Sequence, residues 1–211
     1  MTTRLYVMAI SNPAAAGAAM VRHKRIPHRV VNLMPGLHPI LVRFAGFAGH
    51  TVPALEAEGR KVQGSRQIAR FLDELKPDPP LFPADPEDRR RVEEAELWGE
   101  VMRLPLPPAM QVLFAPVIRQ LARVSHADEQ TVQADLELLP ALLDRADALI
   151  AEGTIGGGEP NAADFQILAS VRVLLEFEDL SRMLAGRACV PAARRLYPDW
   201  VGPIPSGLPI S

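Results

Sequence analysis

Cysteine is almost absent from this chain of 211 residues, in which Cys189 is the only one, so the chain cannot form an internal disulfide. Aromatic residues are also few, at 5%, and no basic stripe interleaved with aromatic residues is present, which argues against a nucleic-acid-binding surface. No run approaches the roughly 18 consecutive apolar residues of a membrane span, and the first residues lack the pattern of a secretion signal. We therefore expect a cytoplasmic protein with no membrane or nucleic-acid partner.

The composition that is present is typical of a globular protein. Hydrophobic residues make up 48% and charged residues 23% of the chain, which is enough apolar surface to build a core without metal or disulfide support. The charge is divided unevenly, because residues 1–84 hold 11 Lys and Arg against 5 Asp and Glu, whereas the remainder holds 12 against 20. This division suits either a small anionic ligand in the first part or electrostatic matching between two packed domains.

The first 76 residues predict a βαβαββα arrangement. A βαβ unit with parallel strands comes first, followed by a weak helix, a hairpin and a strong amphipathic helix. The predicted elements are a strand at 4–10, a helix at 14–21, a strand at 29–33, a helix at 40–47, strands at 51–55 and 60–63, and a helix that begins at 64–65. We expect Lys24 and Arg25 to complement the dipole at the end of the first helix.

The rest of the chain looks helical. Residues 77–86 are rich in proline and predict a semi-rigid linker. Helices are expected at 88–102, 110–124, 127–152 and 161–177, with shorter ones up to Tyr197. The helix at 161–177 is apolar nearly all round, which indicates a central buried position. The predicted fold is thus α/β plus all-α: a thioredoxin-like domain at 1–76, the linker, and a helical-bundle domain at 87–211.

Three short motifs follow one another in an informative order. They are Thr51-Val52-Pro53-Ala54-Leu55, Gly64-Ser65-Arg66-Gln67-Ile68-Ala69-Arg70-Phe71-Leu72 and Asn161-Ala162-Ala163-Asp164. With these motifs the chain resembles a cytosolic glutathione transferase over almost its full length, either of the serine type or a divergent member. The resemblance implies glutathione as cosubstrate, a small apolar electrophile as second substrate, a role in detoxification and a homodimer. It also assigns Asn161 and Asp164 to a helix-start cap.

The resemblance places glutathione at two of these motifs. A cis bond before Pro53 would turn the backbone of Val52 toward the peptide backbone of glutathione, with Thr51 beside it, whereas an ordinary trans proline opening a strand is the alternative. Ser65 and the helix amides would receive the γ-glutamyl carboxylate, although Ser65 could equally be a helix N-cap. The family usually has an acidic or amide residue where this chain has Gly64, and Gln63 is expected to point to the other side of its strand.

Further predictions concern the rest of the ligand and the thiol. His50 is placed to touch the glycine carboxylate of glutathione. The resemblance assigns the thiol-activating hydroxyl to Ser11, just after the first strand, whereas capping of the first helix is the other role open to it. The second hydroxyl or thiol that the family commonly carries about three residues on is replaced by alanines at 14–16.

Other constellations give weaker signals. Met102, Met110 and Phe114, with Trp98, could line an apolar cosubstrate pocket, or belong to the core. The histidines at 23, 28, 38 and 50 lack the spacing of a metal site, so no metal is expected. Glu93, Glu94 and Glu96 are expected on a solvated helix face. A glutathione transferase-like enzyme is the favoured function, a non-catalytic binding protein of the same fold is the alternative, and a glutaredoxin-like reductase lacks a cysteine near the first helix.

Overall fold

The protein is described by a computed structural model, in which residues 3–8, 11–34, 37–101 and 129–199 are placed. Its sheet has four strands in the order β2-β1-β3-β4. β1 (Thr3–Val7) runs parallel to β2 (His28–Asn32) and antiparallel to β3 (Ala54–Ala57), which in turn pairs with β4 (Arg60–Gln63). The predicted βαβ unit and hairpin are therefore confirmed. Residues 51–53, which we expected in the first hairpin strand, lie in the turn before β3.

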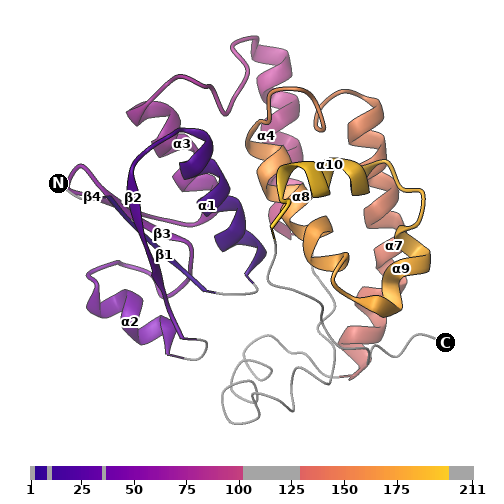
Figure 1. Ribbon diagram of the computed structural model, residues 1–211, viewed down its shortest axis with the longest axis horizontal. Coiled ribbons are helices and arrows are strands. Elements are labelled where there is room, and N and C mark those ends of the chain that lie inside the picture. Colours follow the sequence, from indigo (N-terminus) through magenta and orange to yellow (C-terminus); the bar gives the residue numbers. More distant parts are fainter. Residues whose placement is uncertain (1–2, 9–10, 35–36, 102–128, 200–211) are drawn as a thin grey trace.

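Helices cover both faces of this sheet (Figure 1). α1 (Asn12–His23) and α3 (Ser65–Leu75) pack together on one face, over Leu5 and Leu55. On the other face, α2 (His38–Phe44) places Val42 in a small apolar cluster with Tyr6. Leu5 and Tyr6 point to opposite faces because side chains alternate along a strand.

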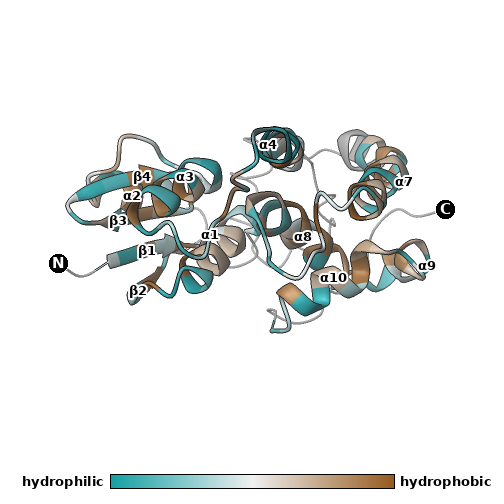
Figure 2. Cartoon of the chain, turned by 90° about the horizontal axis from the view of Figure 1, so that it is seen from above, coloured by the Kyte–Doolittle hydropathy of each residue, from teal (hydrophilic) through white to brown (hydrophobic). Residues whose placement is uncertain are grey.

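The helical part is arranged around α8 (Ala162–Leu174), in which every residue except Arg172 is buried. In both views α8 lies between α1 on one side and α7 on the other, with α4 and α10 beside it (Figures 1 and 2). The contact with α4 is close, since a β-carbon on Gly99 would lie 2.7 Å from Cγ1 of Ile167. The prediction of a central buried helix is confirmed. The other elements are α4 (Pro86–Val101), α7 (Glu129–Ala151), η1 (Glu178–Leu180), α9 (Ser181–Leu184) and α10 (Cys189–Leu196).

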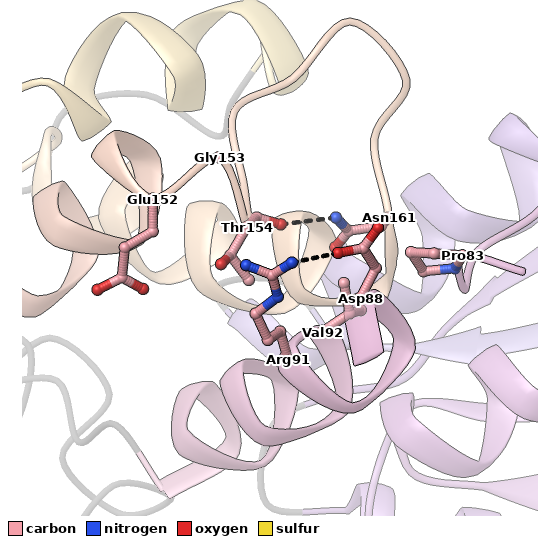
Figure 3. A pocket seen from close by; sticks show the side chains of 8 residues that line it. All are labelled: Pro83, Asp88, Arg91, Val92, Glu152, Gly153, Thr154 and Asn161. Atoms are coloured by element: carbon pink, nitrogen blue, oxygen red, sulfur yellow. Dashed lines mark hydrogen bonds and ion pairs between the residues drawn. The ribbon is translucent and has the colours of Figure 1, made fainter. Parts of the chain in front are cut away.

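The start of α8 carries the predicted cap. Asn161 accepts hydrogen bonds from the N–H groups of Ala163 and Asp164, while Asp164 accepts from the N–H of Asn161 at 3.0 Å. Asn161 also donates to the carbonyl of Thr154 at 2.8 Å. Figure 3 shows this bond beside a pocket of about 190 Å³, which is also lined by Arg91 and Asp88, an ion pair within α4. The cap thus joins α8 to the loop that follows α7.

One expectation about charged residues is wrong, and a second residue has a partner that was not foreseen. Lys24 lies at the end of α1, as expected, but its side chain is completely buried and its ammonium group donates to Asp73 of α3. Glu96 does not lie on the expected solvated face. It is 1% exposed and pairs with Arg66 and Arg70 of α3, at 3.4 Å and 2.8 Å. In both cases a partner on a distant segment makes burial of the charge possible.

The described parts of the chain contain no helix with the length and apolar character needed to span a membrane. The helix expected at 110–124 lies outside the described residues.

Candidate functional site

The turn before β3 has the predicted geometry, since the peptide bond between Val52 and Pro53 is cis. The carbonyl of Pro53 accepts a hydrogen bond from the N–H of Gly64 at 2.9 Å, which brings this turn against the start of α3. The N–H and carbonyl of Val52 have no hydrogen-bond partner among the described residues. They can therefore pair with the backbone of an extended peptide ligand.

The side chain of Gln63 fixes the approach to this turn. Its Oε1 accepts from the N–H of Gly49 at 2.6 Å, and its Nε2 donates to the carbonyl of Thr51 at 3.0 Å. Gln63 thus holds the loop on either side of His50 against β4. Sequence reasoning missed this role, because strand alternation gives the direction of a side chain but not its partner.

Gly64 and Ser65 form the start of α3. Gly64 is the N-cap residue, with a φ of +86° that a residue bearing a β-carbon rarely adopts. Ser65 is the first helical residue and is 4% exposed, so the expectation that its side chain could be the N-cap is wrong. The first backbone bond of this helix runs from Ile68 N–H to Gly64 C=O at 3.0 Å.

As a consequence, the N–H groups of Ser65, Arg66 and Gln67 have no acceptor among the described residues. Amides left in this way at a helix N-terminus bind carboxylates well, because the helix dipole adds to their hydrogen bonds. This end of α3 can therefore bind an anionic group beside the Val52–Pro53 turn.

Ser11 is the N-cap of α1, and its Oγ accepts a hydrogen bond from the N–H of Ala14 at 3.3 Å. The capping role weighed for it is therefore present. Accepting this bond uses an oxygen lone pair and leaves the hydroxyl proton available to a ligand. The neighbouring Asn12 donates from Nδ2 to Oγ of Ser170 at 2.7 Å, which ties the start of α1 to α8. Neither residue type nor spacing in the sequence points to this contact between distant segments.

α1 also packs directly against the turn. A β-carbon on Gly17 would lie 3.0 Å from Cβ and 3.1 Å from Cγ of Pro53. Glycine at this position therefore lets α1 approach the turn as closely as it does.

His50 is exposed and lines a shallow open pocket of about 490 Å³ along α2. Arg43 and Phe44 also line this pocket. Burial, together with the nearby imidazole of His50, lowers the pKa of His38. The structure thus brings Thr51, Val52, Pro53, Gly64 and Ser65 together through the bonds described above, and His50 lies in the same loop, between two residues that bond to Gln63.

The apolar pocket residues cannot be placed, because Met102, Met110 and Phe114 lie outside the described residues. Trp98 is partly buried against the core and borders a separate surface pocket with Arg91 and Leu149. Within the described ranges, no group of three or more His, Cys, Asp or Glu side chains is arranged to hold a metal ion.

Residues 5–80 match the family model described as "Glutathione S-transferase, N-terminal domain". Among curated proteins, the chain is similar to glutathione S-transferase D7 of Drosophila melanogaster, with 27% identity over 200 residues that span 92% of this chain and 84% of that protein. The matched region contains the Val52–Pro53 turn and the start of α3.

Solved structures share the whole fold. FzlA from C. crescentus superposes with a TM-score of 0.69 at 19% identity, covering 97% of this chain and 96% of that one. A glutathione S-transferase from Methylobacterium radiotolerans, in complex with glutathione sulfonate, superposes with a TM-score of 0.65 at 18% identity, covering 97% of each chain. The combination of a thioredoxin-like sheet and a helical part is therefore confirmed as the fold.

Proposed function

Because residues 5–80 match the N-terminal domain of glutathione S-transferases and the chain shares the fold of solved members of that family, we propose that it is a glutathione transferase-like protein that binds glutathione between the Val52–Pro53 turn and the start of α3, and uses the bound thiol in catalysis. One observation carries this proposal. The hydrogen bond from Gly64 N–H to Pro53 C=O holds a peptide-binding backbone and an anion-binding helix terminus next to each other. Glutathione offers a peptide backbone and a carboxylate in the same molecule.

In this proposal each part of glutathione has a counterpart on the chain. The γ-glutamyl carboxylate accepts hydrogen bonds from the Ser65 hydroxyl and the α3 amides. The cysteinyl N–H and C=O pair with the backbone of Val52, while Thr51 and Pro53 shape that turn. The glycine carboxylate extends along the loop toward His50.

Ser11 is the proposed catalytic residue. Its hydroxyl donates to the glutathione sulfur, and the amides at the start of α1 add to the stabilisation of the thiolate. Lowering a thiol pKa from about 8.5 by two units corresponds to roughly 2.7 kcal/mol of stabilisation. The thiolate then attacks an apolar electrophile, forming a carbon–sulfur bond as the leaving group departs with its electron pair. In the reductive alternative, a second glutathione attacks the sulfur of the adduct, so that glutathione disulfide forms and the substrate leaves with the electron pair and takes up a proton. Met102, Met110 and Phe114 are proposed to face this second substrate.

We further propose a homodimer that works in the cytoplasm. Among the described residues, six of the nine large apolar side chains that are exposed lie on β2, on α2 and in the segment that joins them: Val30, Met34, Leu37, Ile40, Leu41 and Phe44. Such a concentration is typical of an interface. The opposite net charges of residues 1–84 and 85–211 favour pairing of unlike halves of two copies. Light scattering of the wild type and of Phe44→Ser tests this, and a monomeric wild type would contradict it.

Turnover is tested with glutathione and 1-chloro-2,4-dinitrobenzene, a small apolar aryl halide, by following the absorbance of the thioether product. We expect turnover above the uncatalysed rate that requires both substrates. Glutathione binding without turnover of this or other aryl and alkyl halides would instead identify a binding protein of the same fold.

A further inference from the structure

Gly64 presents a problem for the γ-glutamyl end of the ligand, because that end is an α-amino acid with an ammonium group beside its carboxylate. The amides at the start of α3 are donors and can hold only the carboxylate. Gly64 has no side chain with which to accept from the ammonium group, and its N–H already donates to Pro53.

The space beside Gly64 is filled by another residue. A β-carbon on Gly64 would lie 2.5 Å from Oε1 and 3.5 Å from Cδ of Gln67. The carboxamide of Gln67 therefore reaches back by one helical turn and stands where the side chain of residue 64 would begin. Gln67 is exposed, so this carboxamide is accessible to a ligand.

The Gln67 carboxamide does not make the structural hydrogen bond that a glutamine at this position can make. A glutamine at the third helical position can complete a capping box by accepting from the N–H of the N-cap residue. Here that residue is Gly64, whose N–H is bound to Pro53 C=O at 2.9 Å. The Gln67 side chain has no hydrogen-bond partner among the described residues.

The charged neighbours of Gln67 are engaged elsewhere. Arg66 pairs with Glu96 at 3.4 Å and with Glu100 at 3.2 Å. Arg70 pairs with Glu96 at 2.8 Å and donates to the carbonyl of Arg66 at 3.0 Å. The exposed side chain in the first turn of α3 that has no hydrogen-bond partner among the described residues is therefore the carboxamide of Gln67.

We propose that Gln67 is a ligand-binding residue that takes the place of the side chain missing at Gly64. Its Oε1 accepts a hydrogen bond from the α-ammonium group of the γ-glutamyl end, while the helix amides and Ser65 hold the adjacent carboxylate. The site then selects ligands with a free α-amino acid end. This inference rests on the proposed binding of glutathione.

The test pairs two variants with two ligands in isothermal titration calorimetry. The ligands are glutathione and glutaryl-cysteinylglycine, which lacks the ammonium group. We expect Gln67→Ala to bind glutathione about tenfold more weakly than the wild type, the scale of one hydrogen bond to a charged group. Both proteins should bind glutaryl-cysteinylglycine equally. Gln67→Glu keeps an acceptor at this position and should retain glutathione binding.

Glu74→Ala is the matched control, since Glu74 is exposed at the far end of α3 and pairs with Arg60. Its affinity for glutathione should equal that of the wild type. If Gln67→Ala binds glutathione as tightly as the wild type, or loses affinity for both ligands equally, the inference about Gln67 is overturned while the proposed function stands. A wild type that binds no glutathione overturns both.

Discussion

The ammonium group of Lys24 donates to the carboxylate of Asp73, although the Lys24 side chain is completely buried. It also donates to the carbonyl of Lys76 at 2.7 Å, and the same Asp73 oxygen accepts from the N–H of Leu81 at 2.8 Å. The end of α1, the end of α3 and the segment leading to α4 thus meet at one pair of charges. This ion pair therefore holds the segment that follows α3 against the ends of α1 and α3.

Replacing Lys24 should therefore destabilise the protein strongly. Lys24→Met keeps most of the volume but removes the ammonium group from the Asp73 carboxylate and from the carbonyl of Lys76. We expect a loss of about 3 kcal/mol in the free energy of unfolding, the usual scale for breaking a buried ion pair on one side. Urea denaturation measures it. Arg60→Met, which breaks the exposed pair with Glu74, should leave the midpoint unchanged. Equal effects of the two variants would contradict the role of Lys24.

Replacing Glu96 by a neutral residue should cost less stability than removing its partner Arg70. Burial raises the pKa of Glu96, although Arg70 and Arg66 act in the opposite direction, so desolvation of the charge outweighs the pairing. Glu96→Gln keeps an acceptor for Arg70 and should change the free energy of unfolding by less than about 1 kcal/mol, whereas Arg70→Met leaves a poorly compensated buried carboxylate and should cost about 3 kcal/mol. Urea denaturation that gave the reverse order would refute this reading.

Acidification should weaken the packing of α1 against α8. The ring centroids of His23 and Phe165 lie 5.4 Å apart, and Nε2 of His23 is buried without a hydrogen-bond partner among the described residues. Burial lowers the pKa of His23 below 6.5, with Lys24 and Arg25 adding to the effect and Glu159 and Asp73 opposing it.

As the pH falls below 6.5, the unfolded chain takes up this proton before the folded protein does, so the stabilising contribution of neutral His23 is lost. We expect the free energy of unfolding to fall more steeply between pH 7.5 and 5.5 in the wild type than in His23→Gln. Parallel pH profiles for the two proteins would show that His23 plays no part.

Ser11→Ala separates a catalytic hydroxyl from a helix cap. If Ser11 donates to the thiolate, the variant should raise the apparent pKa of bound glutathione by about one to two units and cut turnover by roughly ten- to a hundredfold, with little change in affinity. Ser11→Thr keeps the hydroxyl and should behave as the wild type. Thiolate absorbance in the ultraviolet, followed against pH, measures the effect. A cap alone would cost about 1 kcal/mol of stability and leave the thiol titration unchanged.

The sequence predicted the elements whose residues carry a periodic or motif signal. The parallel strands, the hairpin, the buried α8 and its cap at Asn161 and Asp164 were all found in this way. The cis bond at Pro53 followed from a family motif rather than from periodicity.

The contacts that were missed depend on partners that periodicity does not reveal, and most of these partners lie far along the chain. A lysine at a helix end normally extends into solvent, and only the proximity of Asp73 makes the burial of Lys24 possible. Gln63 and Gln67 look like ordinary polar residues in the sequence, because their importance comes from the loop at Gly49–Thr51 and from the missing side chain of Gly64.

The most direct test of the account is a calorimetric titration of the wild type and of Ser65→Ala with glutathione. We predict a single site with a dissociation constant below about 1 mM for the wild type, and affinity weaker by roughly 1 to 2 kcal/mol for Ser65→Ala, the range for losing a hydrogen bond to a charged group. Absence of glutathione binding to the wild type would contradict the account. Unchanged affinity in Ser65→Ala would show that the start of α3 does not hold the γ-glutamyl carboxylate through this hydroxyl.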